Sequence, residues 1–256
     1  MASVTVPTKP LPSGAQIPVV GFGAFLADYD AVLSALKLGY RHIDTAEDYE
    51  NEEAVGRAVR DSGIPRDQIF ITSKVNERLG LGHIDLYLLH APGASATRAE
   101  TWRALEDLQS EGIVKDIGVS NFSEAHLAKL AETWRVKPAL NQIEVNPFVT
   151  RAELVAHCQS QHIYIEAYSP LAKSTKLADP VVTQIANEVG ATPAQVLIAY
   201  SLAKDFITLP KSNNLERQRL NLEAVNVKLS AEQVAKLDTL DEYLVLSWDP
   251  IKNEPV

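Results

Sequence analysis

Four polar side chains in the first half of the chain are of the types that reduce a carbonyl group. They are Asp44, Tyr49, Lys74 and His90. A phenol has a pKa of about 10 and is a weak acid at neutral pH, but a nearby ammonium group favours the phenolate and lowers that value. We therefore expect Lys74 to activate Tyr49 as a proton donor. Asp44 can hold Lys74 in its charged form, and His90 can orient a carbonyl through a hydrogen bond.

The elements that must bring these side chains together are short, apolar and rich in β-forming residues. Asp44, Lys74 and His90 each close such a run, so each is expected at the carboxyl end of a buried strand. Tyr49 is expected in the loop after its strand. Amphipathic stretches alternate with these runs, and eight repeats of strand and helix predict an α/β fold of the (β/α)8 TIM barrel type, with residues 1–256 as one domain. The expected strands are 19–25, 41–44, 69–74, 84–90, 115–119, 139–143, 163–168 and 206–210.

The link between the third and fourth expected strands is too short for an ordinary barrel crossover. It consists of residues 75–83, whereas a parallel crossover needs about a dozen residues or more and usually contains a helix. We therefore expect the third outer helix to be missing, and the apolar strand surface near Ile71 and Leu86 to be uncovered. The alternative is that this helix is dispensable and that the barrel closes without it.

Each of the four polar residues has an ordinary explanation when it is taken alone. An Asp after a strand is commonly a helix cap, a Lys at a strand end is commonly solvated, and a single His is more often a packed core residue than a catalyst. The order of the motifs argues against these explanations. HIDTA-x-x-Y, ITSK and LLH-x-P are followed by KDIGVSNF at 115–122, ALNQIEVNP at 139–147, IEAYSPL at 165–171 and LPKS at 209–212. Over nearly the whole chain this series resembles the aldo-keto reductase family, whose members normally carry a helical segment where this chain has its short link.

The resemblance implies a nicotinamide cofactor that is bound by loops at the mouth of the barrel. The GxG formed by Gly21 and Gly23 lacks the third glycine of a dinucleotide fingerprint, so it is interpreted as a tight strand end. A cationic pair with a hydroxyl matches the family residues around a 2′-phosphate, which favours NADPH (NADP+) over NADH. The implied cofactor-binding residues are Ser120, Asn121 and Gln142 for the carboxamide, Tyr168 for the ring, Lys211, Ser212 and Arg217 for the phosphate, and Asn221 for the adenine, together with Leu171.

The substrate pocket implied by the same resemblance is apolar and open. One position that is aromatic in the family holds Ala91 here, another falls in the missing segment, and the chain after Leu244 is short. A broad pocket for aldehydes or activated ketones follows more naturally than a site for a steroid or a single sugar. The expected lining residues are Phe25, Tyr49, His90, Phe122 and Trp248.

Composition argues against several other classes of function. The chain has 24 Lys and Arg against 33 Asp and Glu, a net charge of −9 and no run of like charges, so nucleic acid is a poor candidate partner. Cys158 is the only cysteine, which leaves no internal disulfide and no cysteine cluster for a metal. No stretch approaches about eighteen uninterrupted apolar residues, and the first residues lack the layout of a signal peptide. We therefore expect a cytoplasmic monomer that acts on a small-molecule carbonyl substrate without a metal or a membrane.

Two hypotheses for the function stay open at this point. The first is an NADPH-dependent carbonyl reductase in which Tyr49 donates the proton. The second is a barrel that binds NADPH with little or no turnover, either a redox-sensing or interaction module or a defective shortened variant, because the short link adjoins Lys74 and the strand of His90. An isomerase or aldolase that uses Lys74 as a Schiff base is disfavoured by the nearby Asp44 and Tyr49.

Overall fold

Eight parallel strands form a barrel in the computed structural model, which describes residues 4–74, 79–253 and 255–256. Neighbouring strands follow one another in chain order from β3 to β10, and a parallel bridge between Val20 and Thr208 brings the two ends together. Each strand overlaps one of the segments expected from the sequence, so the (β/α)8 fold is confirmed. The strands are β3 (Phe22–Gly23), β4 (His42–Asp44), β5 (Phe70–Ser73), β6 (Ile84–Leu89), β7 (Val114–Ser120), β8 (Leu140–Glu144), β9 (Tyr164–Tyr168) and β10 (Ile207–Leu209).

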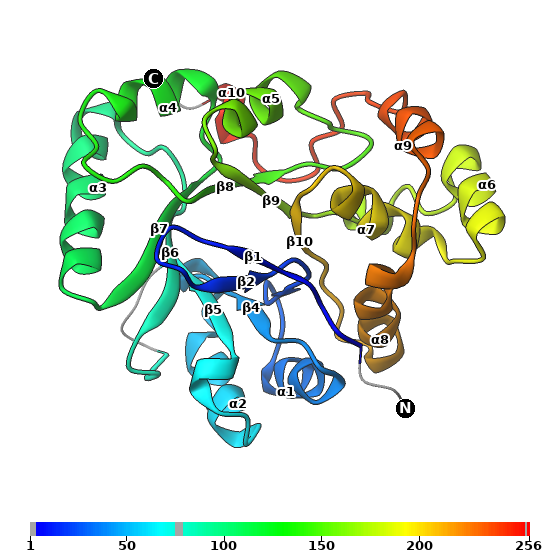
Figure 1. The fold of residues 1–256 in the computed structure, drawn as a ribbon, viewed down its shortest axis with the longest axis horizontal. Coiled ribbons are helices and arrows are strands. Elements are labelled where there is room, and N and C mark those ends of the chain that lie inside the picture. The colour runs from blue at the N-terminus through cyan, green and yellow to red at the C-terminus, as the bar shows by residue number, and fades with distance from the viewer. Residues whose placement is uncertain (1–3, 75–78, 254) are drawn as a thin grey trace.

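Helices surround the barrel and begin and end at residues that favour those positions (Figure 1). Gly39 closes the first helix with φ 113°, a conformation that glycine adopts without steric cost. The Thr192 side chain caps a later helix, with Pro193 in its first turn. The helices are α1 (Tyr29–Leu38), α2 (Glu52–Asp61), α3 (Ser95–Ser110), α4 (Glu124–Ala131), α5 (Ala152–Ser160), α6 (Pro180–Val189), α7 (Pro193–Ala203), α8 (Leu215–Glu223), α9 (Ala231–Asp238) and α10 (Pro250–Asn253).

The N-terminal segment fills one end of the barrel. The antiparallel strands β1 (Thr8–Pro10) and β2 (Gln16–Pro18) cross the centre of the barrel in Figure 1. Leu11 and Ile17 of this hairpin are buried in one cluster with barrel residues that include Leu86 and Ile207. Because apolar side chains fill this end, polar groups that do chemistry are expected at the carboxyl ends of the strands.

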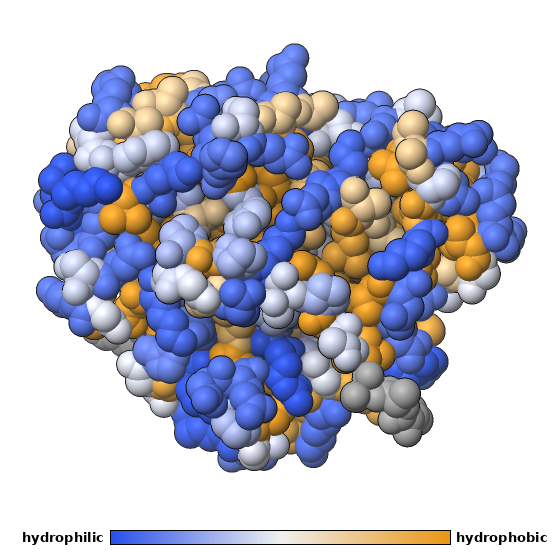
Figure 2. Space-filling view, viewed as in Figure 1, coloured by the Kyte–Doolittle hydropathy of each residue, from blue (hydrophilic) through white to orange (hydrophobic). Residues whose placement is uncertain are grey.

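Hydrophilic side chains dominate the face of the molecule that carries the hairpin. Figure 2 shows them surrounding separate hydrophobic areas on this face. Such a mixture is ordinary for a protein surface, much of which is apolar in any folded protein. Within the described residues, no helix combines the length and the apolar character needed to cross a membrane.

The described part of the link between β5 and β6 contains no helix, as the sequence predicts. Residues 79–83 form bends, while residues 75–78 lie outside the described residues. The expected exposure of the strands is wrong, because Ile71 and Leu86 are both 0% exposed. Leu86 is buried inside the barrel, and Ile71 belongs to the large cluster between the strands and the helices.

Leu79, in the returning part of the link, covers some of the surface next to α2. It is 1% exposed and lies in the same buried cluster as Ile71. Arg60 donates through Nη1 to the carbonyl oxygens of Leu79 and Gly80 at 3.1 and 3.3 Å. The link approaches α2 so closely that a Cβ at Gly56 would lie 2.0 Å from the carbonyl oxygen of Leu79. The close contact therefore requires glycine at position 56.

We expect Gly56→Ala to lower the free energy of unfolding by about 1–3 kcal/mol, because the added methyl group must displace the backbone at Leu79. Helix propensity alone predicts the opposite sign, since alanine is favoured over glycine by about 1 kcal/mol in a helix interior. Urea unfolding followed by circular dichroism measures the difference. Glu53→Ala, at an exposed position of the same helix, is the control. A Gly56→Ala protein as stable as the wild type would contradict the packing of the link on α2.

Candidate active site

A buried ion pair lies at the carboxyl ends of β4 and β5. The side chains of Asp44 and Lys74 are 4% and 1% exposed. The Lys74 Nζ donates to both carboxylate oxygens of Asp44 at 3.1 Å and to the Thr45 carbonyl at 3.2 Å. Burial lowers the pKa of Lys74, but the charge and hydrogen bonds of Asp44, together with Tyr49 and Glu166, outweigh that effect and leave the pKa raised. Lys74 is therefore a charged ammonium at neutral pH.

Tyr49 lines the cavity beside this ion pair. It ends the single turn Glu47–Tyr49 after β4, and the Lys74 Nζ lies 5.4 Å from the centroid of its ring. The ring meets Phe25 and His90 edge to face, with centroids 5.1 and 6.2 Å apart. Burial raises the pKa of Tyr49, and the charge of Lys74 offsets only part of that increase. The expectation of a net lowered pKa is therefore wrong for this arrangement, because desolvation of the phenolate outweighs the ammonium.

His90 follows β6 and contacts Tyr49 on the cavity side. Burial and the nearby charge of Lys74 lower the pKa of His90 to about 4, so the ring is neutral at pH 7. Its Nδ1 lies 3.2 Å from a carboxylate oxygen of Asp48, a contact that favours the tautomer with the hydrogen on Nδ1. The sequence reasoning missed Asp48, and its position directly before Tyr49 was the only signal.

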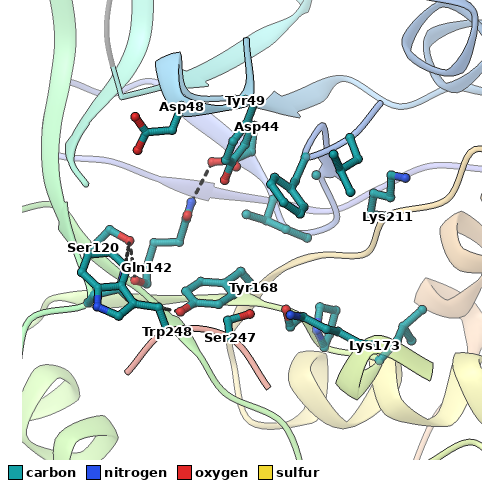
Figure 3. A pocket seen from close by; sticks show the side chains of 18 of the residues that line it. Asp44, Asp48, Tyr49, Ser120, Gln142, Tyr168, Lys173, Lys211, Ser247 and Trp248 are labelled. Carbon is teal, nitrogen blue, oxygen red and sulfur yellow. Dashed lines mark hydrogen bonds between the residues drawn. The ribbon is translucent and has the colours of Figure 1, made fainter. Parts of the chain in front are cut away.

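A network of amide and carboxyl groups lies next to the ion pair, inside the barrel. Gln142 Nε2 donates to Asp44 at 2.7 Å (Figure 3). It donates to Glu166 at the same distance. These bonds use both amide hydrogens, so the carbonyl oxygen of Gln142 is the group that can accept from a bound amide. Burial and the charge of Asp44 raise the pKa of Glu166 to about 8. Glu166 therefore holds its proton more strongly than an ordinary glutamic acid, and the sequence reasoning did not identify it.

Three further residues that were expected to bind the nicotinamide are linked to one another. Ser120 Oγ donates to the backbone carbonyl of Gln142 at 2.9 Å. Asn121 Nδ2 donates to the backbone carbonyl of His90 at 3.1 Å. The Tyr168 hydroxyl donates to Asn121 Oδ1 at 2.9 Å. Ser120, Asn121 and Tyr168 all line the cavity. Their polar atoms and one aromatic ring suit a planar ring that carries a carboxamide.

The basic residues expected at a phosphate group lie near the start of α8. Lys211 lines the cavity, and burial together with the positive charge of Arg217 lowers its pKa. Two cations that destabilise each other in this way favour the binding of an anion. Ser212 and Asn221 are 8% and 3% exposed and are not in the cavity wall. Of these four residues, only Lys211 belongs to the cavity wall.

The cavity has a volume of about 660 Å³, which is within the usual range for a small-molecule site. Phe122 does not belong to its wall, contrary to expectation. This ring is 0% exposed and packs edge to face on His126, with centroids 5.8 Å apart. Within the described part of the chain, no cluster of three or more side chains could hold a metal ion. Of the other expected residues, the wall includes Phe25, Tyr49, His90, Leu171 and Trp248.

The C-terminal tail supplies one wall of this cavity. The Glu144 carboxylate, at the end of β8, accepts hydrogen bonds from the backbone N–H groups of Leu246 and Ser247 at 3.2 and 3.3 Å. Lys173 Nζ donates to the carbonyl of Leu246 at 2.6 Å. These bonds fix the backbone next to Trp248, although this side chain is 53% exposed. Lys173 and Ser247 line the cavity and carry no sequence motif that would have singled them out.

Comparison with known sequences identifies the family. A model of the Aldo/keto reductase family matches residues 27–78 and 75–242. An aldo-keto reductase of Mycolicibacterium vanbaalenii is 41% identical over 271 residues, which cover 97% of this chain and 97% of the relative. The glyoxal reductase of Bacillus subtilis is 38% identical over 257 residues, which cover 92% of this chain and 93% of the relative. The chain belongs to the aldo/keto reductase family.

Solved structures of this family share the fold. The crystal structure of MGS-M4, an aldo-keto reductase from a Medee basin deep-sea metagenome library, has a TM-score of 0.92 and 33% sequence identity, and covers 97% of this chain and 100% of its own. A Bombyx mori aldo-keto reductase in complex with NADP has a TM-score of 0.88 and 32% identity, with 94% and 95% covered. Family membership accounts for the order of the motifs along the barrel.

The comparisons also concern the short link. The two segments that match the family meet at residues 75–78. The alignment with the Mycolicibacterium vanbaalenii protein spans 271 positions, more than the 256 residues of this chain. That relative therefore has residues with no counterpart here. A family segment that is missing after Lys74 fits both observations.

We expect the wild type to lose stability relative to Glu166→Gln as the pH rises from about 6.5 through 8. The folded-state pKa of Glu166 is raised to about 8, so its contribution is fully present below the unfolded value and is lost as the pH rises through 8. One pKa unit corresponds to about 1.4 kcal/mol. Urea unfolding across this pH range measures the effect. Glu153→Gln, at an exposed position, is the control, and an unchanged pH dependence in Glu166→Gln would show that the buried acid is not responsible.

Proposed function

We propose that this protein reduces aldehydes or activated ketones to alcohols with NADPH, and that Tyr49 donates the proton. One observation carries the proposal: Tyr49 faces the cavity with the Lys74 ammonium 5.4 Å from its ring centroid, and Asp44 fixes that ammonium from behind. A phenol in contact with a permanent cation can lose its proton to a developing alkoxide more easily than one without it.

The side chains divide the work around the substrate carbonyl. When bound, NADPH supplies the hydride. Tyr49 gives its proton to the carbonyl oxygen, and Lys74 stabilises the phenolate that is left. His90 is neutral at pH 7 and orients the carbonyl. Donation from its second nitrogen requires release of the Asp48 contact, which costs little because the Asp48 side chain is 77% exposed.

The cofactor would lie along the cavity floor formed by the strand ends. Asn121, Ser120 and the carbonyl oxygen of Gln142 offer donors and acceptors to the carboxamide, and the ring of Tyr168 offers a stacking surface. Lys211, with Ser212 and Arg217, is assigned to the 2′-phosphate that distinguishes NADPH from NADH. The Bombyx mori relative solved with NADP and the relative named glyoxal reductase support a nicotinamide cofactor and a small carbonyl substrate.

The short link favours a second candidate, an NADPH-binding barrel with little or no turnover. The link begins directly after Lys74, so a distorted β5 would displace the cation that Tyr49 depends on. Against this candidate, Lys74 keeps bonds to Asp44 and Thr45, and β5 pairs with β6 in register. The reductase is therefore preferred, and its rate of turnover distinguishes the two candidates.

We expect Tyr49→Phe to lower kcat for an aldehyde such as glyoxal by at least about a hundredfold, because a positioned general acid contributes about 10²–10⁴ to a rate. NADPH binding, measured by fluorescence titration, is expected to stay nearly unchanged. Tyr164→Phe, at the opposite end of the barrel, is the matched control. Full kcat in Tyr49→Phe would exclude this phenol as the acid, and a wild type without turnover would select the non-catalytic candidate.

Neutralising Lys211 and Arg217 together is expected to weaken NADPH binding at least about tenfold more than NADH binding. Only NADPH carries the 2′-phosphate, and a hydrogen bond to a charged group contributes about 1.5–3 kcal/mol. Fluorescence titration with both cofactors measures the two losses. The control is a double variant at Lys37 and Arg103, both exposed on helices outside the cavity. Equal losses for NADPH and NADH would place the phosphate elsewhere.

A further inference from the structure

The cavity carries opposite charges at its two ends. Figure 3 shows Asp48 on one side of the cavity, and Lys173 and Lys211 toward the other side. Asp44 also lines the cavity, but its carboxylate is bonded to the Lys74 ammonium. Asp48 is therefore the negative charge that no cation balances among the described residues, because the His90 imidazole beside it is neutral at pH 7.

Asp48 also lies next to the groups that act on the carbonyl. It directly precedes Tyr49 in the same turn, and its carboxylate is 3.2 Å from the Nδ1 of His90. A carbonyl oxygen that contacts both Tyr49 and His90 therefore lies close to the Asp48 carboxylate. Any charge on the substrate close to that carbonyl therefore interacts with Asp48 at short range.

We propose that Asp48 selects substrates by charge: it disfavours carbonyl compounds that bear a carboxylate near the reacting carbon, and it favours neutral or cationic ones. This inference rests on the proposed reductase function and narrows its substrate class. Lys173 and Lys211 do not cancel the effect, because they lie toward the opposite side of the cavity. Two unit charges about 8 Å apart in an effective dielectric of about 40 alter binding by about fivefold.

Three matched aldehydes test the proposal. They are para-formylbenzoate, its neutral amide para-formylbenzamide, and the cationic para-formylphenyltrimethylammonium. The measured quantity is kcat/KM with NADPH for the wild type and for Asp48→Asn. Intrinsic reactivity and any effect on His90 cancel when the carboxylate-to-amide ratio of one enzyme is compared with that of the other. We expect Asp48→Asn to raise this ratio about fivefold and to lower the cation-to-amide ratio by a similar factor.

Two controls separate a local charge from other causes. Glu47→Gln removes the same charge from the neighbouring exposed residue outside the cavity wall, and is expected to change either ratio less than twofold. High salt should move the wild-type ratios toward those of Asp48→Asn, because screening weakens the exposed carboxylate. Ratios in Asp48→Asn that stay within twofold of the wild type would overturn the proposal.

The test also distinguishes failure of the inference from failure of the proposed function. If the wild type reduces none of the three aldehydes, the reductase function fails. If it reduces them and Asp48→Asn leaves their ratios unchanged, only the charge selection fails. If Asp48→Asn loses measurable turnover, dissociation constants of the three aldehydes from the enzyme with NADP+, followed by the fluorescence of Trp248 and the other tryptophans, supply the same ratios. A fivefold shift in these constants supports the proposal, and its absence overturns it.

Discussion

The buried pair of Lys74 and Asp44 is the interaction on which the rest of the site depends. Burial lowers the pKa of an ammonium in this position, and Asp44 is the main group that opposes this effect. The positive charge of Lys74 acts on two neighbours. It contributes to the lowered pKa of His90, and it offsets part of the increase that burial causes in the pKa of Tyr49. Asp44 is in turn held by Gln142, whose amide also donates to Glu166. Buried groups inside the barrel therefore influence the pKa values of the residues that line the cavity at its carboxyl end.

Backbone pairing between β5 and β6 is retained next to the short link. The strands stay in register through Thr72 opposite Leu86 and Ser73 opposite Tyr87. Arg66 adds bonds to the carbonyl of His83 at 2.8 Å and to Asp85 at 2.9 Å. Hydrogen bonds of this kind act along the strands and fix the spacing of their ends. A barrel can thus lose an outer element and still hold the residues that follow its strands.

Local signals predicted the barrel and the strand-end positions of three of the site residues, and several of the misses depend on contacts between distant segments. Apolar runs that end in a polar residue are readable along the chain, so Asp44, Lys74 and His90 were placed correctly at strand ends. The burial of Ile71 depends on the returning link, and the net pKa direction of Tyr49 depends on desolvation by neighbours from several elements. Phe122 was assigned to the cavity from its position next to Asn121, but the left-handed backbone at Asn121, with φ 64°, interrupts the regular alternation of side chains. No pattern in the sequence indicated that Asp48 and Lys173 would meet the cavity.

The attachment of the tail to Glu144 has a consequence for how such a site diversifies. The carboxylate binds two peptide N–H groups, and every amino acid except proline provides that donor. The tail is therefore anchored without regard to the identity of residues 246 and 247. Side chains there, and the Trp248 indole that lines the cavity, are free to change while the backbone keeps its path. Glu144 thus fixes the path of the tail, and substitutions in the tail can change the shape of the cavity without disturbing the Lys74–Asp44 pair.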